Sequence, residues 1–328
     1  MGRLPAEIIA NIISYLAAEG SSHGSGDNSG DNSESLALAP YATVSRGWQQ
    51  RVEATTFAHI TLTPARLASP LTAQALTPDR VRRFVRSIRI DVLLPPYSEQ
   101  ARARHEDEAD RAMNEDVFTD VVRRVFGLLA ATIALESPAA MAGGQGSQQQ
   151  QQQRAGVDAD YRPKIHLSMT ACCASDIEDL EARKYRWRVY GSTHTDIFEA
   201  RSESSYLDLR LAAEALPELY CIKQFDVKAA VSPQRRYFAP RALCLIASRM
   251  LGLESIDWTL CDNEKRDIAL RKRLRADFAY ALQTLPSSLQ HFDLLYDRYP
   301  PLDHSFQPPS ILDKTDYDNN DKLSLALY

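Results

Sequence analysis

Cysteine is scarce in this sequence of 328 residues. The five cysteines are an odd number, and their spacing is not that of a disulfide framework. Cys221, Cys244 and Cys261 lie in apolar segments with the patterns of strands or helices. We therefore expect buried, reduced thiols and a reducing compartment, either the cytosol, the nucleus or both.

Long apolar runs and targeting signals are also missing. No stretch approaches 18 uninterrupted apolar residues, so no membrane-spanning helix is expected. The first residues have no apolar signal-peptide core, and position 6 is not the Ser or Thr of a myristoylation signal. A net charge of −5 gives no basis for a nucleic-acid or membrane partner, which would favour a basic surface.

Motifs of catalysis and metal binding are lacking too. The sequence contains no nucleophile elbow and no phosphate-binding glycine loop. Ser192, His194 and Asp196 could form part of a triad, but folding and not sequence proximity assembles triads, so a polar loop is favoured. Cys172 and Cys173 are adjacent, and no Cys-x-x-Cys or His-x-x-x-His pair supports a zinc site. We expect no catalytic residue, no metal and no cofactor; a deep pocket with converging titratable groups would reopen the question of an enzyme.

The first 67 residues predict a small helical module. Residues 4–16 have the apolar spacing of an amphipathic helix, and Pro5 suits its first turn. Residues 20–35 are rich in Gly, Ser, Asp and Asn and predict a disordered insertion. A second helix follows, with Tyr41, Val44, Ser45, Trp48 and Val52 along one side, and then a short extended segment before Pro64.

Residues 80–328 predict an α/β domain. Alternation indicates strands near 85–92, 165–169 and 206–211, whereas 99–116 predicts a solvated loop or the exposed start of a helix. The buried side of a helix follows: Val117, Phe118, Val121, Val122, Val125, Leu128, Leu129 and Ile133. Residues 137–160, with six consecutive glutamines, predict a low-complexity surface insertion.

A short signature recurs three times in the second half of the chain. It reads Ile222-x-x-Phe225-Asp226, Leu253-x-x-Ile256-Asp257 and Leu289-x-x-Phe292-Asp293, at spacings of 31 and 36 residues. Helical patterns lie between the copies, and Gly252 is placed to end the first of these helices. Such repetition favours an open solenoid with a curved, mainly parallel sheet, although a non-repeating α/β domain remains an alternative.

Two features could recognise a partner. Asp226, Asp257 and Asp293 could form a carboxylate ladder that receives a basic ligand, but we favour residues that end each strand or cap the following turn. Trp187 lies in an aromatic and basic cluster (Arg183 to Tyr190) that could stack on nucleic-acid bases. On an acidic chain, a protein-recognition edge is favoured.

The quoted segments have a family resemblance. LPAEIIANIISYL, APYATVSRGWQQRVEATTF and HITLTPARL, within residues 3–67, resemble the F-box of filamentous-fungal F-box proteins, through Leu4-Pro5 and through Val44-Ser45-Arg46-Gly47-Trp48. LPELYCIKQFDV, FAPRALCLIASRMLGLESIDW and LPSSLQHFDLL, within 217–310, are similar to the leucine-rich-repeat-like region of the same family. The chain departs from the family in its insertion at 20–35. Family members also continue through further repeats, whereas residues 323–328 look like the beginning of one more repeat helix.

The resemblance implies an adaptor of a cullin ubiquitin ligase. The helical module would bind the small Skp-type adaptor, and the repeat domain would bind an unknown protein target. The residues that would bind the Skp-type adaptor are Leu4, Pro5, Ile8, Ile9, Ile12, Leu16, Val44, Ser45 and Trp48. Two alternatives stay open: these residues pack on the repeat domain, or the F-box is degenerate and the chain is a ligase-independent scaffold.

Overall fold

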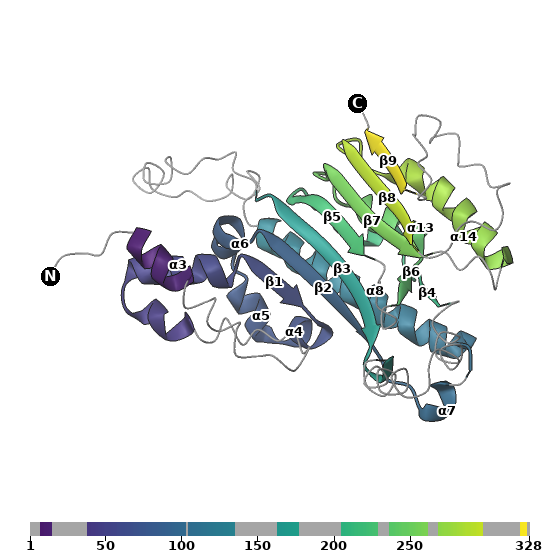
Figure 1. Cartoon of the computed structure of the whole chain (residues 1–328), viewed down its shortest axis with the longest axis horizontal. Coiled ribbons are helices and arrows are strands. Elements are labelled where there is room, and N and C mark those ends of the chain that lie inside the picture. Colours follow the sequence, from purple (N-terminus) through teal and green to yellow (C-terminus); the bar gives the residue numbers. More distant parts are fainter. Residues whose placement is uncertain are drawn as a thin grey trace, which may run out of the picture.

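A computed structural model of the chain describes residues 7–14, 38–102, 104–134, 163–176, 205–228, 236–261, 268–297 and 322–326. The two expected insertions at 20–35 and 137–160 lie outside these ranges. The described residues form a mixed α/β structure with a mainly parallel sheet (Figure 1).

The main sheet has seven strands within the described ranges, in the order β1-β2-β3-β5-β7-β8-β9. Neighbours from β1 to β8 are parallel, and β9 is antiparallel to β8. The strands are β1 (His59–Leu62), β2 (Ser87–Leu94), β3 (Ile165–Cys173), β5 (Ile222–Lys228), β7 (Ser255–Cys261), β8 (His291–Asp297) and β9 (Lys322–Ala326). Spatial order therefore follows sequence order, without the reversal that marks doubly wound sheets.

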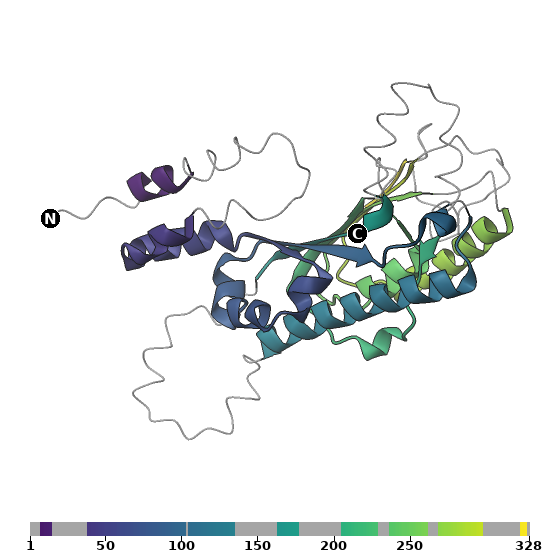
Figure 2. The same cartoon turned by 90° about the horizontal axis from the view of Figure 1, so that it is seen from below.

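One face of the sheet is apolar and the other is polar. Along β3 every second residue is buried, from Ile165 to Cys173, and β2 alternates in the same way. Helices α8 (Glu108–Ala134), α13 (Pro240–Ala247) and α14 (Ile268–Ala281) cover the apolar face (Figure 2). Alternation of this kind, and not a continuous apolar run, is what a strand with one helix-covered face requires.

The main core lies between this sheet face and the helices. Trp258 of β7 is fully buried in it, with the rings of Phe225 and Phe292 edge-on at 5.8 and 5.5 Å. The predicted apolar side of 117–133 is confirmed for Phe118, Val121, Val122, Val125 and Leu129 of α8, which are all buried. α8 begins at Glu108, so part of 99–116 is the start of a helix, preceded by α7 (Glu99–Arg102).

The N-terminal helices have a small core of their own. They are the helical segment 7–14, η1 (Ala39–Thr43) and α3 (Arg46–Thr56). Ile9, Ile13, Leu38 and Val52 form a buried cluster that is separate from the main core. The alternative that this helix packs on the sheet domain therefore does not describe Ile9 and Ile13.

The expected boundary at residue 67 does not coincide with a break in the structure. β1 was expected to be the exit of the helical module, but it pairs with β2 in the main sheet, and Leu62 is buried in the main core. Three short helices follow: α4 (Pro64–Ala68), α5 (Pro70–Ala75) and α6 (Pro78–Phe84). Each begins with proline after a Ser or Thr N-cap, which removes an unsatisfied N–H and lets the cap oxygen accept another.

Three other expectations are corrected. Residues 322–326 form strand β9 and not the start of a helix. The expected strand at 206–211 is only β4 (Tyr206–Leu207), which pairs with β6 (Tyr237–Phe238) in a separate two-stranded sheet of the described residues. Gly252 does not end α13, which stops at Ala247; a Cβ there would lie 2.2 Å from the Tyr220 carbonyl oxygen, so only glycine fits this close approach.

No helix in the described ranges is long and apolar enough to span a bilayer.

Candidate protein-binding surfaces

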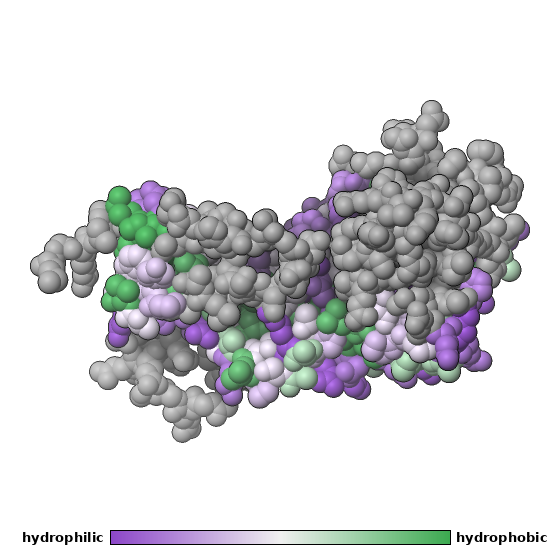
Figure 3. Space-filling view, turned by 60° about the horizontal axis from the view of Figure 1, so that its bottom comes forward, coloured by the Kyte–Doolittle hydropathy of each residue, from purple (hydrophilic) through white to green (hydrophobic). Residues whose placement is uncertain are grey.

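The helical segment 7–14 has one buried and one exposed apolar side. Ile9 and Ile13 are 9% and 2% exposed, whereas Ile8 and Ile12 are 44% and 36% exposed. The exposed pair arises because four isoleucines occupy eight residues, more than one helix stripe can hold. Figure 3 shows apolar surface at this end of the molecule. Ile8, Ile12 and Val44, which is 62% exposed, are named here the apolar patch.

The neighbouring residues of the expected docking motif have different roles. Ser45 is the N-cap of α3, and its Oγ accepts a hydrogen bond from the Trp48 N–H at 3.4 Å. Trp48 is half-buried and stacks on Tyr41, with ring centroids 6.0 Å apart. Ser45 and Trp48 therefore shape the helical module as well as face its surface. The sequence analysis missed Leu38, which is buried in the cluster of Ile9, Ile13 and Val52, because it follows the polar stretch at 20–35 and shows no periodicity of its own.

Several residues singled out in the sequence fall outside the described ranges. Leu4, Pro5, Leu16 and Trp187 lie outside the described residues, as do Ser192, His194 and Asp196.

The three repeated aspartates lie side by side on the polar face of the sheet. Asp226 pairs in register with Asp257, and Asp257 pairs with Asp293, on β5, β7 and β8. All three lie inside their strands, so the favoured interpretation, that they end strands or cap turns, is wrong. The three aspartates form a ladder because they occupy the same register position in three neighbouring parallel strands.

These carboxylates already have partners. His166 Nε2 lies 2.8 Å from Asp226 Oδ2, and Gln224 donates to the other oxygen of Asp226 at 3.1 Å. Lys228 forms an ion pair with Asp257. A basic ligand would therefore have to exchange with internal partners, and the ladder is less attractive to cations than three free carboxylates would be.

The polar face extends beyond the ladder. On β2 and β3, Asp91 accepts from Arg89 Nε and from the Thr170 hydroxyl, both at 2.7 Å. His59 and Ser87, on β1 and β2, lie 2.7 Å apart. Sequence reasoning missed these residues, although the alternate positions of strands 85–92 and 165–169 could have identified them. The face is a continuous row of paired polar groups, suited to recognition by hydrogen bonding.

The described residues give no support to metal or thiol chemistry. Within them, no group of three or more His, Cys, Asp or Glu side chains could hold a metal ion. Burial raises the pKa of Cys221 to about 12 and raises the pKa of Cys244 further, so both thiols stay protonated and inert at neutral pH. The expectation of buried, reduced thiols is confirmed for these two; the side chain of Cys261 lies outside the description.

No known protein-family description matches this chain, and no curated protein matches it.

Proposed function

We propose that this protein is a non-enzymatic adaptor, in which the N-terminal helices bind a Skp-type subunit of a cullin ubiquitin ligase and the sheet domain binds a protein target. The apolar patch of Ile8, Ile12 and Val44 carries the proposal. Exposed apolar side chains of this size gathered on one small module are typical of a surface that another protein covers.

The form of the patch fits helix packing by a partner. Ile8 and Ile12 are four residues apart on one helix side, and Val44 lies at the turn just before α3. Apolar side chains at such spacing fill the groove between partner helices, and a few of them supply most of the binding energy. The resemblance of residues 3–67 to an F-box is the reason for proposing a Skp-type subunit as the partner.

The sheet domain supports the second half of the proposal as a leucine-rich-repeat-like solenoid. Its strands follow sequence order, and the helices α8, α13 and α14 lie together on one face. The repeated signature is in register across three strands, because Phe225, Ile256 and Phe292 align as the aspartates do. A solenoid of this kind presents its polar sheet face to a partner. Holding ligase and target together raises their effective concentration, and no catalytic residue is needed.

The test is binding of purified full-length protein to a purified Skp-type adaptor. Ile8→Asp combined with Ile12→Asp places two charges in the patch without entering the core of Ile9 and Ile13. We expect the affinity to fall at least about tenfold, because charged groups would be buried against an apolar surface. Isothermal titration calorimetry measures the change.

Leu71→Asp is the matched control. Leu71 is 69% exposed on α5, outside the helical module, so its substitution places an aspartate on an exposed apolar position away from the patch. Equal binding by wild type and by the Ile8 and Ile12 variant, with both folded by circular dichroism, would refute the docking assignment. If binding appears only after residues 20–34 are deleted, the scaffold with a degenerate F-box is the correct reading.

A further inference from the structure

A cavity of about 240 Å³ lies at the carboxyl ends of β2 and β3. Its apolar wall includes Leu94 and Cys173, the last residues of these strands, together with Tyr97 and Met113. In parallel sheets the carboxyl ends of the strands are the usual place for ligands, because the loops that follow are free to vary.

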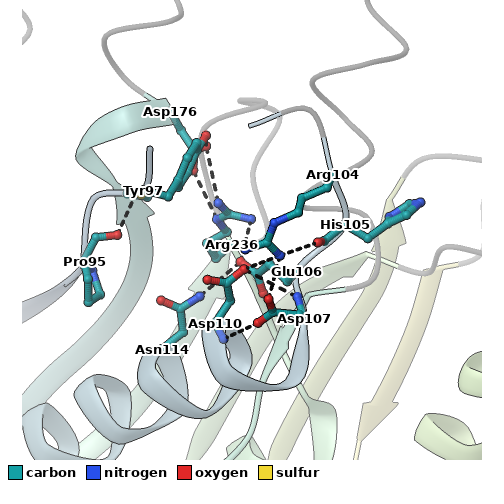
Figure 4. A network of polar contacts seen from close by, with 11 residues as sticks. Pro95, Tyr97, Arg104, His105, Glu106, Asp107, Asp110, Asn114, Asp176 and Arg236 are labelled. Atoms are coloured by element: carbon teal, nitrogen blue, oxygen red, sulfur yellow. Dashed lines mark hydrogen bonds and ion pairs between the residues drawn. The ribbon is translucent and has the colours of Figure 1, made fainter. Parts of the chain in front are cut away.

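A buried arginine lines the cavity. The Arg236 side chain is 1% exposed and lies between Asp176 and Glu106 (Figure 4). Its Nε lies 3.1 Å from Asp176 Oδ2, and its Nη1 lies 3.3 Å from Glu106 Oε1. Both contacts are ion pairs, but neither nitrogen makes a hydrogen bond, because the angles are unsuitable. Among the side-chain nitrogens of Arg236, Nη2 alone donates a hydrogen bond to a described residue, Asp176, at 3.4 Å. A guanidinium has five N–H donors, so Arg236 keeps donors without an acceptor among the described residues.

Both arginines at the cavity already have carboxylate partners. Arg236 faces two carboxylates, and Arg104 lies 2.9 Å from both Asp107 and Asp110. Of the charged residues that line the cavity, Arg104 and Arg236 are cationic and Asp110 is anionic, and Glu106, Asp107 and Asp176 behind the wall complete the ion pairs of the two arginines. A charged ligand would have to compete with these existing ion pairs, so the site favours an uncharged ligand.

We infer that this cavity is a binding site for a small uncharged molecule with a carbonyl oxygen on an apolar body. The carbonyl would accept the hydrogen bonds that Arg236 leaves unmade, and the body would contact Leu94, Tyr97 and Met113. A buried donor without an acceptor destabilises the ligand-free protein. A ligand that supplies the acceptor removes this penalty, and the energy recovered adds to its affinity. This inference does not depend on the proposed function.

The probe set is benzamide, benzoate and benzylamine, which share one ring and differ in the charge of the polar group. Binding to the full-length protein is followed by ligand-observed saturation-transfer NMR. We expect benzamide to bind with a dissociation constant on the order of 1 mM, as suits so small a fragment, and the two charged probes to bind at least about fivefold more weakly. No binding by benzamide, or tighter binding by either charged probe, would overturn the inference.

A cavity-filling variant locates the site. Met113 is 47% exposed on α8, so Met113→Trp fills the cavity mouth without altering the Arg236 ion pairs. We expect it to lower benzamide affinity at least about tenfold. Leu71→Trp, on the exposed surface of α5, is the control and should bind as wild type does. Unchanged binding by the folded Met113→Trp protein would place benzamide elsewhere and contradict the assignment.

Discussion

The N-terminal helices and the sheet domain differ in the size of the hydrophobic core that each of them buries. The sheet domain places one face of β1, β2, β3, β5, β7 and β8, together with helices α8, α13 and α14, around a single large core, in which Trp258 is 0% exposed. The N-terminal helices bury only Ile9, Ile13, Leu38 and Val52, with Tyr41, Ala42 and Trp48 packed against them. So small a core stabilises a domain weakly, and such modules gain stability from neighbours or from partners.

The two regions meet where α3 ends: Phe57, the residue after α3, packs against the main core, and a polar contact lies beside it. Arg80 of α6 lies 3.1 Å from Glu53 of α3 and 5.1 Å from the centre of the Phe57 ring. A partly exposed ion pair of this kind contributes about 0–1 kcal/mol, less than a shared apolar core would. The cluster of Ile9, Ile13, Leu38 and Val52 is nevertheless separate from the main core, so we expect the two regions to respond separately to mutation.

The largest effect is expected from Trp258→Ala. Removing the indole from the contacts with Phe225, Phe278 and Phe292 leaves a large cavity in the main core. We expect the free energy of unfolding to fall by about 3–5 kcal/mol. Urea unfolding monitored by circular dichroism measures the loss, and Leu71→Ala on the surface should change it by less than about 0.5 kcal/mol. A loss below about 1 kcal/mol would mean that Trp258 is not central to the fold.

Ile13→Ala should destabilise the small core of the N-terminal helices. Ile13 is 2% exposed, and its truncation should cost about 2 kcal/mol, the low end for such changes because a small cluster can close around the gap. We expect faster hydrogen exchange in segment 7–14 and in α3, with the amides of β3 and β5 unchanged. If hydrogen exchange accelerated equally in both regions, the two cores would unfold as one unit, and the proposed independence of the N-terminal helices would be wrong.

Tyr97→Phe gives the smallest and most pH-dependent effect. Burial, followed by the hydrogen bond that the hydroxyl donates to Asp176, raises the pKa of Tyr97 above its ordinary value of 10.0. A raised folded-state pKa stabilises the fold fully below pH 10.0, and this contribution is lost as the pH rises further. Wild type should therefore exceed Tyr97→Phe by about 1.5 kcal/mol at pH 8, with a smaller gap at pH 11. Urea unfolding at both values checks this; a gap that is constant or grows with pH would contradict it.

Much of the sheet domain could be predicted because its patterns are local. Alternation along 85–92 and 165–169 predicted β2 and β3, and the spacing of Phe118, Val121 and Val125 predicted the buried side of α8. The common Asp of three signatures predicted a shared position, which the register confirms. Local periodicity is enough wherever a strand or helix has one buried face.

The remainder depends on contacts between distant segments. Arg236 meets Glu106 and Asp176 across 130 and 60 residues of sequence, and no spacing rule connects them. Gly252 is required by the carbonyl of Tyr220, which only the folded chain brings near. The pairing of β1 with β2, and of β9 with β8, likewise assigns short segments to a sheet by tertiary contacts that override weak local patterns.

The agreement between strand order and sequence order has a consequence for folding and fraying. Each parallel strand from β2 to β8 pairs with the strand of the main sheet that precedes it in the chain, so the sheet can be assembled by successive addition, with no need for a distant strand to arrive first. For the same reason, detachment of β1 at one end leaves every pairing from β2 to β9 intact. The sheet can therefore lose order from its margins inward while its centre, around β3, β5 and β7, stays assembled.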